Sequence, residues 1–224
     1  MEKLLLSEIA HCLNAECPEE KVITEISTDT RNLPAGCLFI AIKGERFDGH
    51  AFIKQAIENG AAAAVSEYPV DGCPCIVVKN TRTALLKLAK YYRSKFKPVL
   101  VGITGSVGKT TTKEMIALVL SEKYKTLKTQ GNLNNEIGLP KTLFNLDSSY
   151  QAAVIEMGMS DFGEIERLSN TAVPTIGVIT NIGFSHIENL KSQEGILKAK
   201  LEILSGMKSD APLTLMAMTD ILLL

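Results

Sequence analysis

The sequence VLVGITGSVGKTTT, residues 99–112, decides the fold of this 224-residue chain. Its first residues are mostly β-formers, a glycine-containing turn follows at residues 105–108, and Lys109-Thr110-Thr111 begins a helical pattern. Glycines allow successive backbone N–H groups and the positive end of a helix dipole to converge on an anion. Lys109 would add a positive charge there, and the Thr110 hydroxyl is placed to ligate Mg²⁺. The stretch therefore predicts a strand, a phosphate-binding loop and a helix.

The spacing of this loop departs from the common G-x-x-x-x-G-K-[ST] pattern. Ile103 stands five residues before Gly108, and the nearest glycines are Gly102 and Gly105. A plain strand–turn–helix connection would also use glycine. Because Gly-Lys-Thr lies between a strand and a helix, the phosphate loop is favoured over that alternative.

The composition indicates a globular protein with a substantial core, since 46% of the residues are hydrophobic and 22% are charged. A net charge of −1 gives no sign of a nucleic-acid or membrane surface. No apolar stretch reaches the roughly 20 residues that span a bilayer, and residues 1–14 predict an amphipathic helix rather than a signal peptide. Five scattered cysteines suggest reduced thiols. We expect a cytoplasmic monomer without nucleic-acid partners or membrane insertion.

Strand-like and helix-like segments alternate along the chain, which predicts an α/β fold with parallel sheets. The pattern places strands at residues 37–42, 61–65, 75–78, 99–103, near 126, 152–156 and 175–180. It places further helices at residues 51–59, 81–97, 109–121, near 140, 164–169 and 193–204. Pro98 marks the best boundary, since helices usually stop before the residue that precedes proline. We therefore predict a small N-terminal α/β domain over residues 1–97 and a P-loop parallel-sheet domain over residues 98–224.

Three residues of the second domain are candidates for metal binding or catalysis. Glu156 ends a strand beside the expected loop and could hold Mg²⁺, although a surface glutamate explains its position equally well. His186 follows a strand, where a hydrogen-bonded loop histidine is the simpler interpretation because histidine is an unusual Mg²⁺ ligand. Lys200 lies on the last predicted helix, where a solvated lysine is the default.

A series of segments in order along the chain resembles the Mur ligases of peptidoglycan synthesis. The segments are STDTR (27–31), GCLFIAIKGERFDGH (36–50), TGSVGKTTTKEM (104–115), NLNNEIGLP (132–140), VIEMG (154–158), TNIGFSHIE (180–188) and KAKLEI (198–203). The family's own loop has the form TGSxGK[ST], so the resemblance accounts for the unusual spacing. GERFDGH and NLNNEIGLP are similar to the members that add D-Ala-D-Ala, rather than to those that add the third residue of the stem peptide.

The resemblance implies ATP and Mg²⁺ as cofactors, and UDP-N-acetylmuramoyl-tripeptide and D-Ala-D-Ala as substrates. It implies ATP-driven amide ligation, in which the γ-phosphoryl group passes to the substrate carboxylate and the dipeptide amine attacks the acyl phosphate. The implied nucleotide site is Gly105, Ser106, Val107, Gly108, Lys109, Thr110, Thr111 and Asn134. The implied metal site is Thr110, Glu156 and His186. The implied catalytic residues are Lys109, His186 and Lys200, the last matching a family lysine that becomes a carbamate. The implied UDP-substrate site is Ser27, Thr30, Arg31, Lys43, Gly44, Asp48 and His50.

Mur ligases resemble one another in having three domains, so the resemblance leads us to expect that a C-terminal ligase domain is absent here. We expect residues 211–224 to be a frameshifted tail, and the polypeptide alone to have negligible ligase activity. A remnant that binds nucleotide and UDP-sugar without catalysis, and the Mur ligase that adds the third residue, stay open as alternatives. A signalling GTPase is disfavoured because no N-K-x-D-type segment follows the loop. Folylpolyglutamate synthetase is disfavoured because about a hundred residues precede the loop.

Overall fold

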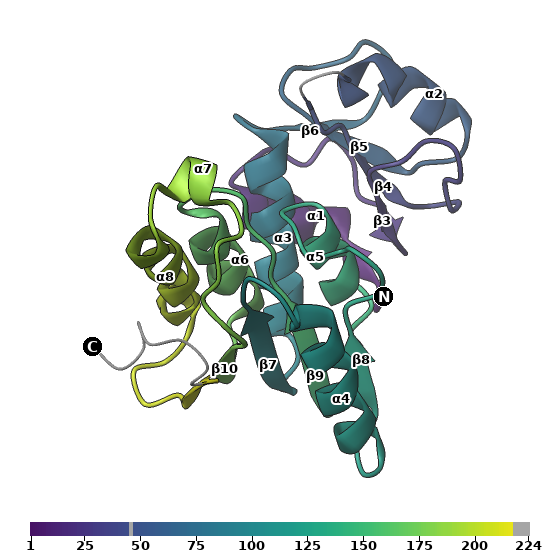
Figure 1. Cartoon of the computed structure of the whole chain (residues 1–224). Helices are drawn as coiled ribbons and strands as arrows, with labels where there is room; N and C mark the ends of the chain where they lie inside the picture. The colour runs from purple at the N-terminus through teal and green to yellow at the C-terminus, as the bar shows by residue number, and fades with distance from the viewer. Residues whose placement is uncertain (45–46, 217–224) are drawn as a thin grey trace. The chain divides into compact units, whose positions relative to one another are not determined.

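The computed structural model describes residues 1–44 and 47–216 (Figure 1). The chain forms two compact units, Met1–Tyr91 and Tyr92–Leu224. The division falls inside one helix, α3 (Thr81–Ser94), whose last residues belong to the second unit. The domain boundary predicted between residues 97 and 98 lies shortly after this division, and the predicted domains themselves stay a prediction.

The first unit contains a four-stranded parallel sheet in the order β3-β4-β5-β6. The strands of this sheet are β3 (Ile26–Ser27), β4 (Leu38–Ile40), β5 (Ala63–Ser66) and β6 (Cys75–Val77). The unit also contains a two-stranded sheet of β1 (Leu4–Leu5) and β2 (Val22–Ile23). The helices of the first unit are α1 (Leu6–Leu13), the 3₁₀ helix η1 (Gly49–Phe52), α2 (Ile53–Glu58) and the first part of α3. Phe39, Ile53, Ala56 and Ala64 belong to its core, which packs α2 against the sheet.

Two helices of the first unit begin differently from the sequence prediction. The helix predicted over residues 1–14 begins only at Leu6, because Leu4 and Leu5 pair with β2 as an antiparallel ribbon. The helix predicted over residues 51–59 is preceded by the 3₁₀ turn η1, whose first turn is capped by Asp48. The apolar periodicity of the sequence predicts both helices. Where they start is decided by the pairing of Leu4 and Leu5 with β2 in one case and by the Asp48 cap in the other.

The second unit contains a five-stranded parallel sheet in the order β11-β10-β7-β9-β8. Its strands are β7 (Val99–Thr104), β8 (Thr126–Lys128), β9 (Ala152–Glu156), β10 (Ile176–Ile179) and β11 (Leu213–Leu215). Its helices are α4 (Lys109–Ser121), α5 (Gly138–Leu143), α6 (Glu164–Ala172), α7 (Ile187–Leu190), α8 (Gln193–Leu201) and the 3₁₀ helix η2 (Glu202–Gly206).

Helix α4 lies along β8 and β9 in this unit (Figure 1). Val101 and Ile103 of β7 pack with Ala117 of α4 in one apolar cluster. Successive residues of a strand face opposite sides of the sheet, and Gly102 accordingly lies against Pro174, which follows α6. The sheet is therefore covered on both faces, as parallel sheets require.

The two parallel sheets confirm the predicted α/β fold class. Leu213–Leu215, in the segment expected to be a frameshifted tail, pairs in parallel register with β10. Residues 217–224 of that expected tail lie outside the described residues. Within the ranges described, no helix is both long enough and apolar enough to cross a membrane.

Candidate functional site

The glycine loop of the second unit joins β7 to α4, at the carboxyl end of the central strand. Gly105 has a φ of 151° and Gly108 a φ of 79°, both unfavourable for residues with a Cβ. A Cβ on Gly105 would lie 1.9 Å from Oγ1 of Thr180, which itself donates a hydrogen bond to the Val107 carbonyl at 2.6 Å. Glycine at 105 is therefore required both by its dihedral angle and by the close approach of Thr180.

Asn181 braces this loop from the end of β10. Its Oδ1 accepts hydrogen bonds from the backbone N–H groups of Ser106 at 3.0 Å and Val107 at 2.9 Å. The backbone N–H of Gly183 adds a bond to Oγ of Ser106 at 2.9 Å. No side chain caps the N-terminus of α4, so the N–H groups of its first turn point outward with the positive end of the helix dipole. That end of α4 is chemically suited to bind an anion.

Lys109 folds over the loop from the first turn of α4. Its Nζ donates to the Gly105 carbonyl at 2.9 Å and lies 3.4 Å from the Ser106 carbonyl. Both acceptors are neutral dipoles, whereas a phosphate oxygen carries charge and makes a stronger bond with an ammonium group. Lys109 is thus held within the loop by bonds that an incoming phosphate can replace.

Glu156 ends β9 beside the start of α4, and its carboxylate is held at both oxygens. Oγ1 of Thr110 donates to Oε2 at 3.0 Å, and Nδ2 of Asn134 donates to Oε1 at 2.8 Å. Only 2% of the Glu156 surface is exposed. The structure therefore brings together three of the residues that the sequence assigned to the nucleotide and metal sites.

Lys200 lies on α8 and is fully buried. Burial, and secondarily the positive charge of Lys109, lowers the pKa of Lys200 to about 8. The default interpretation of a solvated lysine at this position is wrong, because the amine is shielded from water. His186 lies in the segment after β10, exposed and with a φ of 62°. Its assignment as a metal ligand stays a prediction.

A hollow of about 360 Å³ in the first unit is lined by part of the predicted UDP-substrate site. Its walls are Thr28, Asp29, Thr30, Arg31, Phe39, Phe47 and Phe52. Asp29 holds the Arg31 guanidinium through bonds of 2.5 to 3.1 Å, and the Phe47 and Phe52 rings stack with centroids 5.0 Å apart. Oγ of Ser27 bonds to the backbone of Asp29, which fixes this turn. Phe47 belongs to the predicted loop at residues 43–50. Phe39 and Phe52 were not predicted, because a phenylalanine in a strand or helix has the same pattern as a core residue.

The other predicted substrate residues lie in and directly after the hydrogen-bonded turn that also contains Phe47. Lys43 and Asp48 form an isolated β-bridge, and the Gly44 N–H donates to the Phe47 carbonyl at 2.8 Å. Nδ1 of His50 lies 2.6 Å from Asp48, and its Nε2 accepts from the Glu67 N–H at 3.0 Å. Because Nε2 is an acceptor, the proton is on Nδ1 and the ring is the neutral tautomer. The bonds of Asp48 to His50 hold the pKa of that carboxyl below its usual range.

His50 is buried, and its ring stacks on Tyr68. Both ring nitrogens are already bonded, so the observed contacts of His50 are structural. Its predicted contact with substrate stays a prediction.

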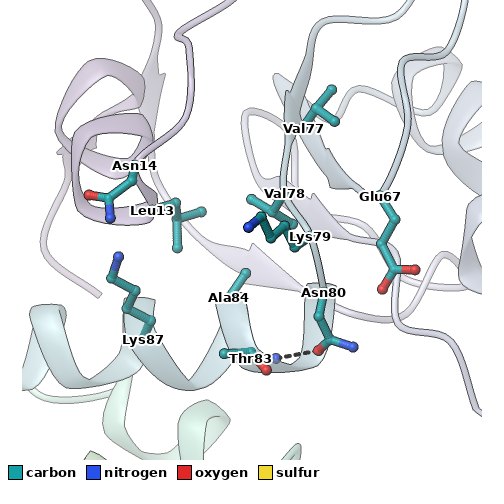
Figure 2. A pocket seen from close by; sticks show the side chains of 10 residues that line it. All are labelled: Leu13, Asn14, Glu67, Val77, Val78, Lys79, Asn80, Thr83, Ala84 and Lys87. Atoms are coloured by element: carbon teal, nitrogen blue, oxygen red, sulfur yellow. Dashed lines mark hydrogen bonds between the residues drawn. The ribbon is translucent and has the colours of Figure 1, made fainter.

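A groove of about 840 Å³ lies in the first unit, lined by residues at the end of α1 and the start of α3. Figure 2 shows the side chains that line it. Lys79 and Lys87 line it, and the Lys87 side chain points toward Asn14 (Figure 2). Asn80 caps α3 by accepting from the Thr83 N–H at 2.8 Å. None of the predicted substrate residues lines this groove.

The loop between β7 and α4 combines an uncapped helix N-terminus, a lysine and a neighbouring carboxylate. This arrangement at the ends of parallel strands is typical of α/β proteins that bind nucleotide phosphates. Two protein-family models match the chain and identify its family within this class. The model for the Mur ligase middle domain matches residues 103–222, and that for the Mur ligase family catalytic domain matches residues 22–93. The chain belongs to the Mur ligase family.

Curated relatives and solved structures are similar to the chain over most of its length. The UDP-N-acetylmuramoyl-tripeptide–D-alanyl-D-alanine ligases of Bacillus subtilis and Escherichia coli are 50% and 43% identical, over 87% and 92% of this chain. Those matches cover 44% and 46% of the relatives, so the chain spans about half their length. A crystal structure of MurF from Acinetobacter baumannii has a TM-score of 0.93 and 35% identity, over 99% of this chain and 50% of that one. MurF ligase from Thermotoga maritima, solved in complex with ADP, has a TM-score of 0.83 and 36% identity, over 88% and 47%.

The donor set around Glu156 fits the magnesium ion that this family implies. Mg²⁺ prefers hard oxygen ligands and usually binds through one or two carboxylates together with substrate phosphates and water. Glu156 supplies a carboxylate and Thr110 a hydroxyl, next to the loop suited to phosphate. Within residues 1–44 and 47–216, no three histidine, cysteine, aspartate or glutamate side chains cluster as a self-contained metal site. The Glu156 carboxylate and the Thr110 hydroxyl beside the glycine loop suit a metal ion that arrives with a nucleotide.

Proposed function

We propose that the chain carries the ATP site and the UDP-substrate site of an ATP-dependent amide ligase. The proposed ligase joins D-Ala-D-Ala to UDP-N-acetylmuramoyl-tripeptide, which is the activity named for its relatives from Bacillus subtilis and Escherichia coli. The observation that carries the proposal is the Glu156 carboxylate, held by Thr110 and Asn134 beside the glycine loop. We also propose that the protein is monomeric and cytoplasmic.

The proposed nucleotide site works by placing positive charge around the phosphates. The first-turn N–H groups of α4 and the Lys109 ammonium bind the phosphate oxygens, and Lys109 leaves the loop carbonyls to do so. Glu156 and Thr110 hold Mg²⁺, and His186 is proposed as a further metal-site residue. When bound, Mg²⁺ neutralises charge on the phosphates during transfer.

The proposed reaction has two steps. First, the terminal carboxylate of the tripeptide attacks the γ-phosphorus, the bond to the ADP oxygen breaks, and an acyl phosphate forms. Then the D-Ala-D-Ala amine attacks the acyl carbon, a C–N bond forms, inorganic phosphate leaves and the amine loses a proton. The chain's part in the first step is to align and neutralise the two anions, which repel each other in water.

Lys200 is proposed to become a carbamate. Only a neutral amine reacts with CO₂, and a lysine of ordinary pKa is almost entirely protonated near neutrality. With its pKa lowered to about 8, Lys200 is about one-tenth neutral at pH 7. The carbamate would replace a buried cation by an anion, which suits a site that binds Mg²⁺.

The hollow between Arg31 and the phenylalanines is proposed to receive the UDP part of the substrate. A flat aromatic lining suits stacking of a planar base, and Arg31 suits a phosphate or carboxylate. Lys43, Gly44, Asp48 and His50 are proposed to border the same substrate.

Calorimetric titration of the 224-residue chain tests both halves of the proposal. ATP with Mg²⁺ and UDP-N-acetylmuramoyl-tripeptide should each bind to the wild-type chain. Lys109→Ala should weaken ATP at least tenfold and leave the UDP substrate unchanged, while Arg31→Ala should do the reverse. Lys123→Ala, an exposed change just after α4, serves as the control and should affect neither. A wild-type chain that binds neither ligand, or equal effects of both variants on both ligands, would overturn the proposal.

A further inference from the structure

A buried lysine next to the nucleotide loop has no part in the reaction proposed above. Lys113 lies one turn after Lys109 on α4, and only 1% of its surface is exposed. A buried ammonium group has lost its hydration and requires polar partners in exchange. Its Nζ donates to the Thr129 backbone carbonyl at 2.7 Å and lies 3.2 Å from Oε1 of Glu114. Because the Glu114 side chain is half-exposed, the bond to Thr129 is the buried one of the two.

Thr129, directly after β8, joins this lysine to Glu156. Its backbone N–H donates to the Val154 carbonyl at 3.0 Å, which anchors it to β9. Its Oγ1 accepts the backbone N–H of Glu156 at 3.0 Å in a buried hydrogen bond. The backbone of Glu156 is thus fixed by Thr129, while its carboxylate accepts from Thr110 and Asn134.

These bonds connect the first turns of α4 with the ends of two neighbouring strands. Thr110 and Lys113 are three residues apart on α4, and each bonds to one side of the Thr129–Glu156 pair. Glu156 is therefore held from the carboxylate side by Thr110 and from the backbone side, through Thr129, by Lys113. Loss of the Lys113 ammonium would leave the Thr129 carbonyl without this donor and so remove one of the bonds that fix Thr129.

We propose that Lys113 is a positioning residue for the magnesium site: its buried ammonium fixes Thr129, and Thr129 fixes Glu156. This inference rests on the proposed nucleotide function of the same site. Lys113 bonds to Thr129 and Glu114, so it would act on the metal site through the orientation of the Glu156 carboxylate. Groups that orient a metal ligand typically change metal affinity by about 10- to 100-fold when they are replaced.

The test is the affinity of the whole chain for the fluorescent analogue N-methylanthraniloyl-ATP, measured once with Mg²⁺ and once with EDTA. The ratio of the two dissociation constants isolates the part of binding that depends on the metal. In Lys113→Met, which keeps the aliphatic length and removes the charge, we expect about tenfold weaker binding with Mg²⁺ and unchanged binding with EDTA. A general loss of structure would weaken both.

A second pair of variants tests the link through Thr129 even if Lys113→Met fails to fold. Thr129→Val removes the acceptor of the Glu156 N–H at nearly constant shape, whereas Thr129→Ser keeps it. We expect Thr129→Val to lose the Mg²⁺-dependent part of binding and Thr129→Ser to retain it. The double variant Lys113→Met/Thr129→Val should be no worse than the more affected single one, because both act through one path.

Glu114→Gln serves as the matched control, since it removes the negative charge of the exposed partner of Lys113 and leaves the Thr129 bond in place. It should leave the ratio unchanged. An unchanged ratio in both Lys113→Met and Thr129→Val, with wild-type binding still dependent on Mg²⁺, would refute the role of Lys113 alone. A wild-type chain whose nucleotide binding ignores Mg²⁺ would overturn both this inference and the proposed metal site.

Discussion

Replacing Lys200 by methionine should make the chain more stable at pH 7. Lys200 is buried on α8, and its pKa is lowered from 10.5 to about 8, chiefly by burial and further by the charge of Lys109. That difference corresponds to about 3 kcal/mol of unfavourable free energy in the folded, protonated state. Methionine has nearly the same length and no charge, so we expect Lys200→Met to raise the free energy of unfolding by up to that amount.

The gain should depend on pH in a defined direction. Below pH 8, both the folded and the unfolded wild type carry the proton on Lys200, so the full cost of burying the charge is present. Between pH 8 and 10.5, the unfolded chain still holds this proton and the folded chain releases it, so wild-type stability rises relative to the variant. The difference between variant and wild type should therefore be largest at pH 7 and shrink steadily above pH 8.

Urea unfolding at pH 7, 8, 9 and 10 in buffers freed of CO₂ measures this difference. Lys198→Met, an exposed change on the same helix, is the control and should have little effect at any pH. Added bicarbonate should stabilise the wild type and not Lys200→Met, because CO₂ reacts with the neutral amine, which the folded chain favours more than the unfolded one does. A variant that is less stable than the wild type at pH 7, or a difference that does not vary with pH, would refute this reasoning.

Two further substitutions test the loop and the first unit. Gly105→Ala should cost about 1–3 kcal/mol of stability and abolish ATP binding, since its Cβ would collide with Thr180. Gly131→Ala, at a positive φ with open space around it, is the control and should leave ATP binding intact. Calorimetry with ATP and thermal melting of both variants distinguish the two outcomes. His50→Phe should cost about 1–3 kcal/mol, because it leaves the Glu67 N–H without its acceptor, and an unchanged melting temperature would show that the bonds of His50 do not matter.

The order and type of the long elements could be predicted from the sequence because their apolar patterns are regular. The strand, glycine turn and helix around residues 99–121 follow the local pattern of β-formers, glycine and Gly-Lys-Thr. The two-residue strands β1, β2 and β3 were not predicted, because so short a segment has no period and exists only through its pairing partner.

The candidate site could be predicted only where residues belong to a motif. Thr110 and Glu156 stood out at a helix start and a strand end, and the structure brings them within 3.0 Å. Lys113 and Thr129 gave no signal, since a lysine in a helix is usually solvated and Thr129 becomes its neighbour only when α4 packs on β8. Burial of Lys200 was missed for the same reason, because exposure is a property of packing between distant segments.

The dependence of ATP binding on Mg²⁺ and on Glu156 is the direct test of the proposed metal–nucleotide site. Isothermal titration of ATP into the wild type and Glu156→Gln, each with Mg²⁺ and with EDTA, gives four dissociation constants. We expect Mg²⁺ to tighten ATP binding to the wild type at least tenfold, and Glu156→Gln to abolish most of this gain with little change in EDTA. Equal enhancement by Mg²⁺ in both proteins would contradict the claim that the Glu156 carboxylate, beside Thr110 and the glycine loop, forms the metal–nucleotide site.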